Sequence, residues 1–340
     1  MKDLVGNCAI TRRSFCKFSG RLVLASSVTG LVGCNSLPTH RRLSWGSSSL
    51  GSTGYVIVEG LTSIVNKYTD ISNSSYSTNG SPENMALLGE QTFDIAQTTS
   101  LNWRPAFLGQ SPYRQPIKAH QLFNYAQWQL PLVVRENSGI DSFEALEGRR
   151  IAIGPAAGAG YDCYKLIFEA AGLHDKVQWM FSSWNESYDA VRDGAADATV
   201  AIMLGGEIAG GAEELSLSTS LRVIDIPAHI TDRAIAENPG LSLTEVSPET
   251  FGLIEKSSMI PSFVGIMGCS SAIDEETGYK ITKSIFSHPE DIKRLGRLFQ
   301  FIDLKFALNR LVPFAPVNAG AARYFKEVGI WRDDLLIADI

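Results

Sequence analysis

Short apolar segments lead repeatedly into loops of small polar residues and then into helical patterns, and this alternation constrains the fold more than any other feature. A first unit has a strand over residues 43–46, a loop over 47–55, and apolar residues at helical spacing from Val56 to Val65. A second unit runs from a strand over 150–154, through a glycine-rich loop, to a helix that stops at Gly172. Strands that alternate with helices favour parallel sheets. The pattern predicts an α/β fold.

Two α/β blocks of similar size predict two lobes with a central cleft, joined by crossover strands over residues 130–135 and 262–267. We expect lobe 1 to comprise residues 43–133 and 262–340, and lobe 2 to comprise 134–261. Ser81 is expected to cap a helix that has Pro82 at its first position. The remaining predicted strands cover 68–76, 93–97, 177–180 and 198–202, and the remaining helices cover 142–146, 185–193, 279–286 and 291–309.

The N-terminal segment predicts export and a lipid anchor. A basic segment precedes an apolar stretch from Leu22 to Leu31, and Gly33 precedes Cys34. The apolar part is too short to cross a bilayer, which needs roughly 20 residues. This arrangement is typical of a signal peptide, and a cysteine at the cleavage point is the lipoprotein form. We expect residues 1–33 to be removed and Cys34 to carry a diacylglycerol. Residues 34–42 would then tether the protein in the periplasm or on the outer face of the cytoplasmic membrane.

The export route and the anchor each have an alternative. Arg12 and Arg13, followed by Ser-Phe-Cys-Lys, resemble a twin-arginine export signal. Paired arginines also occur by chance in the basic part of ordinary secretory signals. A plain secretory signal or a short membrane helix would explain the same segment without a lipid.

Charge and cysteine usage exclude several classes. The leader carries a net charge of +4 and the whole chain −6, so the mature chain carries −10. An acidic chain without a basic run argues against a nucleic-acid partner. After the leader and Cys34, Cys163 and Cys269 remain, and they form no disulfide framework. Neither the cysteines nor the histidines show a metal-binding spacing, so we expect no metal and no cofactor. Cys163 is expected to be a buried free thiol.

The loops after the strands suit a small anion. In open α/β sheets, ligands bind beyond the carboxyl ends of the strands, where N–H groups at helix starts favour negative charge. A nucleotide is a weaker reading of residues 154–160, because the loop lacks a Gly-Lys-Ser/Thr ending and a third glycine after Gly158 and Gly160. The same glycines could serve only to pack a strand against a helix.

Four segments together resemble the TAXI family: residues 46–55, 79–84, 154–160 and 316–327. TAXI proteins are the extracytoplasmic solute-binding subunits of TRAP transporters, and the similarity covers roughly residues 43–331. The stretch Gly320 to Glu327 is the most specific part. The resemblance implies a two-lobed periplasmic-binding-protein fold, type II-like, that closes on a solute and docks on a TRAP membrane permease. The family's solutes are small carboxylates such as glutamate and related dicarboxylates.

The resemblance also implies which residues line the cleft. The family's cleft is lined by the first loop, the turn at residues 80–84, the Gly-x-Gly loop and the end of the strand that contains Gln97. The matching residues of this chain are Ser52, Thr53, Tyr55, Ser81, Asn84, Gln97, Gly158 and Gly160. Tyr161 is also expected to line the cleft, at a position where this sequence differs from the family. The family's Gly-Ser-Gly-Thr is here Gly158-Ala159-Gly160-Tyr161, so a methyl and a phenol replace two hydroxyl side chains. The solute contacts must therefore differ, and glutamate specificity does not carry over.

Several of these residues have a structural alternative. Thr53 and Ser81 could be helix caps, and Tyr55 and Tyr161 could be packing aromatics. Arg135 could pair with a solute carboxylate or be structural. Arg323 and Lys326 fit either helix capping or permease docking.

The sequence therefore predicts a binding protein for a small organic anion, not an enzyme. The same fold could instead present its ligand to a signalling receptor. A periplasmic hydrolase is disfavoured because the chain lacks a Gly-x-Ser-x-Gly elbow, a metal cluster and a convincing acid pair.

Overall fold

The computed structural model describes residues 42–339. The predicted leader, the lipid site at Cys34 and all but the last residue of the predicted tether lie outside the described residues, so those predictions stay predictions. No helix within 42–339 combines the length and the apolar character needed to cross a bilayer.

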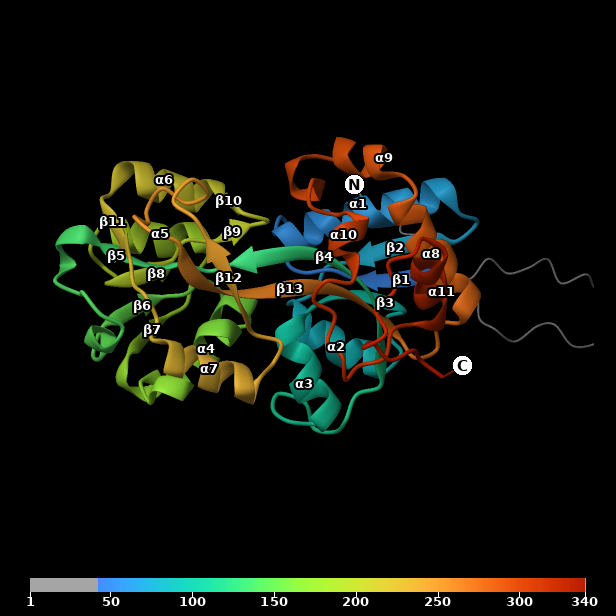
Figure 1. Cartoon of the computed structure of the whole chain (residues 1–340), viewed down its shortest axis with the longest axis horizontal. Coiled ribbons are helices and arrows are strands. Elements are labelled where there is room, and N and C mark those ends of the chain that lie inside the picture. Colours follow the sequence, from blue (N-terminus) through green and yellow to red (C-terminus); the bar gives the residue numbers. More distant parts are fainter. Residues whose placement is uncertain (1–41, 340) are drawn as a thin grey trace, which may run out of the picture. The chain divides into compact units, whose positions relative to one another are not determined.

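The first sheet is mixed and has the order β10-β9-β4-β13-β3-β1-β2, with β12 also paired to β13 (Figure 1). β1 is parallel to β2 and β3, whereas β13 is antiparallel to β3, β4 and β12. Its strands are β1 (Arg42–Gly46), β2 (Ser72–Tyr76), β3 (Ile95–Thr99), β4 (Ala119–Gln129), β9 (Met203–Leu204), β10 (Glu207–Ile208), β12 (Ser242–Val246) and β13 (Ser258–Ser270). The helices of this lobe include α1 (Thr53–Tyr68), α2 (Ser81–Gly89), α3 (Ser100–Leu108), α8 (Glu275–Phe286) and α11 (Ala319–Glu327).

The second sheet has the order β11-β5-β8-β6-β7 and is also mixed. β6 is parallel to β7 and β8, while β5 is antiparallel to β8 and β11. Its strands are β5 (Leu132–Arg135), β6 (Arg150–Ala152), β7 (Gln178–Met180), β8 (Ala198–Val200) and β11 (Leu221–Val223). The helices of this lobe are α4 (Ala159–Ala171), α5 (Trp184–Arg192), α6 (Gly210–Ser218) and α7 (Ala228–Glu237).

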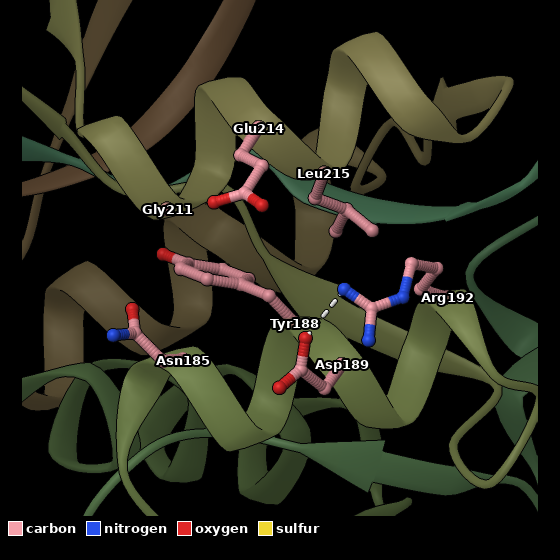
Figure 2. A pocket seen from close by; sticks show the side chains of 7 residues that line it. All are labelled: Asn185, Tyr188, Asp189, Arg192, Gly211, Glu214 and Leu215. Carbon is pink, nitrogen blue, oxygen red and sulfur yellow. Dashed lines mark ion pairs between the residues drawn. The ribbon is translucent and has the colours of Figure 1, made fainter.

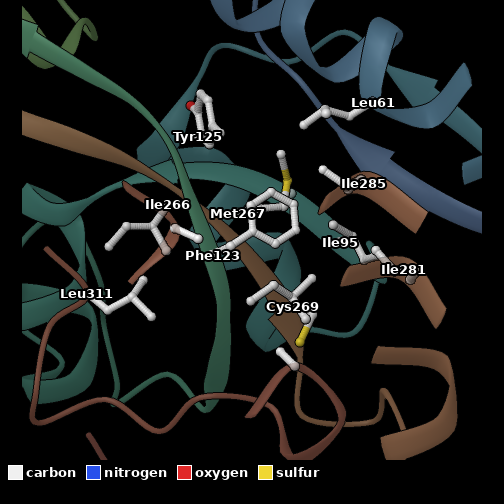
Figure 3. Packing of buried hydrophobic residues seen from close by; sticks show 14 of the residues in the cluster. Leu61, Ile95, Phe123, Tyr125, Ile266, Met267, Cys269, Ile281, Ile285 and Leu311 are labelled. Carbon is white, nitrogen blue, oxygen red and sulfur yellow. The ribbon is translucent and has the colours of Figure 1, made fainter. Parts of the chain in front are cut away.

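Each sheet has its own hydrophobic core, which is why the chain forms two lobes. In the first, Phe123 and Met267 of the central strands pack with Leu61 of α1 and Ile285 of α8 (Figure 3). In the second, β5, β6 and β8 pack against the buried face of α4. A further cluster on the other side of this sheet includes Tyr188 and Leu215 of α5 and α6. Cys163 and Cys269 are buried free thiols, as predicted for Cys163.

The chain passes from the first sheet to the second between β4 and β5, at Leu130 and Pro131. β13 begins beside this crossing, since the Leu130 N–H donates to the Pro261 carbonyl over 2.9 Å. The Leu130 carbonyl accepts from the Tyr164 hydroxyl of α4 at 2.5 Å. β9 and β10 lie between β8 and α6 in sequence but pair in the first sheet. The residue division between the lobes stays a prediction.

Three local predictions were wrong. The expected helix over 291–309 is broken into α9 (Pro289–Arg294), a 3-10 turn and α10 (Leu304–Ala307), because Gly296 takes a left-handed φ of 136°. The strand expected from residue 68 begins at Ser72, because α1 continues to Tyr68. Neither Thr53 nor Ser81 caps its helix: the caps are Ser52 and Gly80.

Candidate functional site

A cavity of about 410 Å³ has walls from both lobes. It lies where α3 contacts α4, with the loop before α4 on one side and the end of α7 on another. First-lobe residues on its wall are Pro82, Leu101, Asn102, Arg104, Pro105, Gln110, Ser111 and Pro112; second-lobe residues are Ala156, Ala157, Tyr161, Asp162, Lys165, Leu166, Glu169, Glu237 and Asn238. Its volume is within the range of small-molecule sites.

Hydrogen bonds to the end of α7 and the loop after it hold α3 at this cavity. The Ser100 hydroxyl donates to the Gly240 carbonyl at 2.5 Å, and the Asn238 amide donates to the Leu101 carbonyl at 2.9 Å. Arg104 donates from Nη1 to the Glu237 carbonyl at 2.6 Å. A Cβ on Gly240 would lie 2.1 Å from the Ser100 carbonyl oxygen, so only glycine permits this close approach.

The Trp184 ring packs closely against the loop before α4 and against the first turn of α4. Gly154 has a φ of 73°, in the left-handed region that favours glycine. A Cβ on Gly154 or on Gly160 would lie 2.5 or 2.8 Å from the Trp184 ring. Gly158 is the residue that caps α4. The packing role is therefore present at Gly154 and Gly160, while solute contact by Gly158 and Gly160 stays a prediction.

Asp162 is the most unusual group on the cavity wall. Its Oδ2 atom is buried and has no hydrogen-bond partner among residues 42–339. Burial raises its pKa to about 6, although a hydrogen bond from Asn102 and the charge of Lys165 act in the opposite direction. The Asp162 charge also adds to the effect of burial in raising the pKa of Tyr113. A carboxyl group held this way can exchange a proton near neutral pH.

An Asp162→Asn variant is expected to be more stable than the native chain at pH 8, by about 2 kcal/mol. Because the folded-state pKa is raised, ionised Asp162 destabilises the fold above pH 6, and protonation removes this cost at lower pH. Asn102 of α3 and Lys165 of α4 act on the Asp162 carboxylate, and the Asp162 charge in turn acts on Tyr113. Urea unfolding at pH 8 and pH 5 checks this: the advantage of the variant should shrink at pH 5. An equal advantage at both pH values would contradict it.

The predicted contacts at the start of α1 do not line this cavity. The Ser52 side chain accepts from the Tyr55 N–H at 3.3 Å and lies 2.6 Å from the Ser48 hydroxyl. Thr53 is the first residue of α1. The pKa of Tyr55 is raised, chiefly by the charge of Glu59. Their predicted contact with a solute stays untested.

Asn84 and Gln97 are buried beneath the loop that follows β1. Asn84 Nδ2 donates to the carbonyl oxygens of Ser47 at 2.6 Å and Gln97 at 2.8 Å. Gln97 Nε2 donates to the Ser47 carbonyl at 3.1 Å, and Gln97 Oε1 accepts from the Tyr125 hydroxyl at 2.6 Å. Both amides thus hold the loop in place, a role that sequence reasoning missed.

Tyr161 is the one predicted contact that the cavity wall includes. Its hydroxyl lies 3.1 Å from His174 Nε2, and its ring packs edge-on against Trp179 and Phe181. Ser81 does not line the cavity, but the next residue, Pro82, does. Arg135 is structural, since its Nη1 donates to the carbonyl oxygens of Val191 at 2.5 Å and Ala196 at 3.1 Å.

A second cavity, of about 210 Å³, lies within the second lobe between α5 and α6 (Figure 2). Arg192 and Asp189 form an ion pair of 2.6 Å at its edge. None of the predicted contacts lines it, and all of its lining residues come from one lobe. Unlike the first cavity, it is therefore not shared between the lobes.

The family model described as the NMT1-like family matches residues 45–329. No curated protein matches the sequence.

Among solved structures, XAC2383 from Xanthomonas citri bound to ATP is similar at 11% identity and a TM-score of 0.50, covering 84% of this chain and 95% of that chain. The periplasmic aliphatic sulphonate binding protein SsuA from Escherichia coli is 14% identical over 76% of this chain and 77% of that chain, with a TM-score of 0.43. A binding protein component of an ABC phosphonate transporter from Pseudomonas aeruginosa is 15% identical over 73% and 74%, with a TM-score of 0.45. The observed sheets and cores, with the likeness of fold to XAC2383, confirm the predicted two-lobed α/β fold.

Proposed function

The chain belongs to the NMT1-like family, and from that premise we propose that it is an extracytoplasmic solute-binding protein. It captures a small organic acid in the cavity between α3 and α4 and delivers it to a membrane transporter. The observation that carries this proposal is a cavity of about 410 Å³ whose wall comes from both lobes. A solute there touches both lobes at once.

Cleft closure is the mechanism that follows from this placement. The lobes are linked at Leu130 and Pro131, through β13, and through β9 and β10, which follow β8 of the second sheet but pair in the first. Bending at these links changes the separation of the lobes. A solute that contacts both lobes binds the closed arrangement more tightly than the open one. It therefore shifts the population toward the closed state by its differential affinity.

The loop before α4 supports an acid group as part of the solute. Ala156 and Ala157 line the cavity, and the first N–H groups of α4 have no acceptor within the helix. Such groups favour an anion. The resemblance to the TAXI family extends the proposal to a carboxylate solute, a TRAP permease and a lipid anchor at Cys34. A sensory role is the second candidate, and a neighbouring permease or histidine kinase gene would distinguish the two.

The proposal predicts that a small carboxylate raises the melting temperature of the purified chain. A panel of mono- and dicarboxylates, amino acids and sugar acids at 1 mM should contain at least one that raises it by several degrees, because a ligand that binds only the folded state stabilises it. Ala156→Trp, which places an indole in the cavity, should abolish the shift. Leu217→Trp, on an exposed part of α6, should leave it intact. A panel without any shift would count against solute binding.

A further inference from the structure

Apolar side chains from both lobes line the cavity and keep part of their surface uncovered. They are Pro82, Pro105 and Pro112 of the first lobe and Ala156, Ala157 and Leu166 of the second. Pro112 and the two alanines are exposed, and the other three are half-buried. A solute that covers this surface removes it from water, which favours binding in proportion to the apolar area covered. A solute in the cavity therefore meets apolar surface on both lobes.

Two amide side chains on the wall are already used within the protein. Asn238 Nδ2 donates to the Leu101 carbonyl at 2.9 Å, and Asn238 Oδ1 accepts from the Gly240 N–H at 3.0 Å. Asn102 Oδ1 accepts from the Thr99 hydroxyl at 2.8 Å. A polar solute group that displaced these bonds would leave buried groups of the protein without a partner, which is costly. The wall thus offers its apolar side chains more readily than its amides.

The charged side chains on the wall favour a solute with one acid group over a solute with two. Three acidic residues, Asp162, Glu169 and Glu237, share the wall with Arg104 and Lys165. The two basic residues already have neighbours: Lys165 lies 3.9 Å from Glu169, and Arg104 donates to the Glu237 carbonyl at 2.6 Å. Because like charges repel, a second carboxylate on the solute is disfavoured by the excess of acidic side chains.

We propose that the captured solute is a monocarboxylate whose remaining part is an apolar chain or ring. This inference rests on the proposed function and narrows its solute class, and it departs from the dicarboxylates that the resemblance to the TAXI family implies. The carboxylate lies toward the loop before α4. The apolar part lies between the prolines of the first lobe and Leu166 of α4. Leu166 is thus a specificity-determining residue.

The first test compares acids of equal carbon number that differ by one carboxylate. Hexanoate is paired with adipate and octanoate with suberate, and calorimetry at pH 8 measures the affinity of each acid for the purified chain. We expect the monocarboxylate of each pair to bind at least tenfold more tightly. Octanoate should also bind at least fivefold more tightly than hexanoate, because each buried methylene group raises an association constant about fourfold.

The second test locates the apolar contact on the wall. Leu166→Ser should weaken octanoate binding at least fivefold, because a short polar side chain replaces an apolar one. Leu217→Ser, the same change at a side chain that is 84% exposed on α6, should leave the affinity within twofold of the native value. Circular dichroism checks that both variants are folded, and the comparison of acids on the native chain depends on neither variant.

The outcomes separate this inference from the function on which it rests. If the dicarboxylates bind as tightly as the monocarboxylates, or more tightly, the apolar solute class is wrong while solute binding stands. An affinity for octanoate that Leu166→Ser leaves unchanged overturns the assignment to this residue. If neither these acids nor the wider carboxylate panel binds, the proposed function fails and the inference fails with it.

Discussion

A Gly320→Ala variant is expected to lose at least about 3 kcal/mol of the free energy of unfolding. A Cβ at this position would lie 1.8 Å from the Glu275 carbonyl oxygen and 2.3 Å from the Tyr279 nitrogen. Both atoms belong to the backbone of α8, so no side-chain rotation relieves the clash. The packing of α11 on α8 would have to open. Urea unfolding followed by circular dichroism measures the loss.

Gly210→Ala is the matched control. Gly210 begins α6, and a Cβ there would meet no atom within 4 Å. Its free energy of unfolding should stay within about 0.5 kcal/mol of the native value. If both variants unfold at the same urea concentration, the close approach of α8 and α11 does not exist as described.

The contact between α8 and α11 explains two residues, Gly320 and Arg323, of the stretch that most specifically resembles the TAXI family. Arg323 Nη1 pairs with Glu275 at 2.6 Å and Nη2 with Glu276 at 2.8 Å, and its guanidinium lies 3.9 Å from the centre of the Tyr279 ring. The cap of α11 is Asn318, not Arg323. Arg323 therefore joins two helices and does not cap α11. Docking on a permease stays a prediction for both Arg323 and Lys326.

The strands and loops around the cavity could be predicted because their signals are local. The apolar run before Gly154, the small residues after it and the stop at Gly172 lie within about two dozen positions. Gly172 indeed takes the left-handed conformation that ends α4. The same local signals located α5, whose cap is Ser183.

Buried polar residues are the reason why other parts of the fold, such as β4, could not be predicted from the sequence. β4 was largely missed because it contains Gln121 and Asn124, which interrupt the apolar pattern. Both are buried: the Gln121 amide donates to the carbonyl oxygens of Val312 at 2.9 Å and Ala315 at 2.7 Å, about 190 positions away. Hydrogen-bond acceptors so distant in sequence cannot be inferred from the residues that surround Gln121.

Asp162 was missed for a related reason. An acidic residue in the first turn of a helix is ordinary on the surface, where it favours the helix dipole. Here α3 and the neighbouring loop cover it, and only the assembled lobes show that one of its oxygens lacks a partner.

The second large effect is expected at Asn84, which the resemblance implies as a solute contact. Asn84→Ala should lower the free energy of unfolding by about 3 kcal/mol. The change removes two donated hydrogen bonds, leaves the Gln97 carbonyl without this donor, and opens a void under the loop after β1. Ser47 keeps the bond from Gln97 Nε2, so the loop should loosen without being lost. Differential scanning calorimetry should show a lower melting temperature.

Thr53→Ala is the control, because Thr53 is a predicted contact on a nearby helix start and does not cap α1. Its stability should change by less than about 0.5 kcal/mol. Bracing of the loop and direct contact with a solute predict different effects of the Asn84→Ala substitution. A bracing residue costs stability first and changes solute affinity only through the loop, whereas a direct contact costs affinity at unchanged stability. An Asn84→Ala chain that melts at the native temperature but binds tenfold more weakly would show that the predicted contact is right and the bracing role wrong.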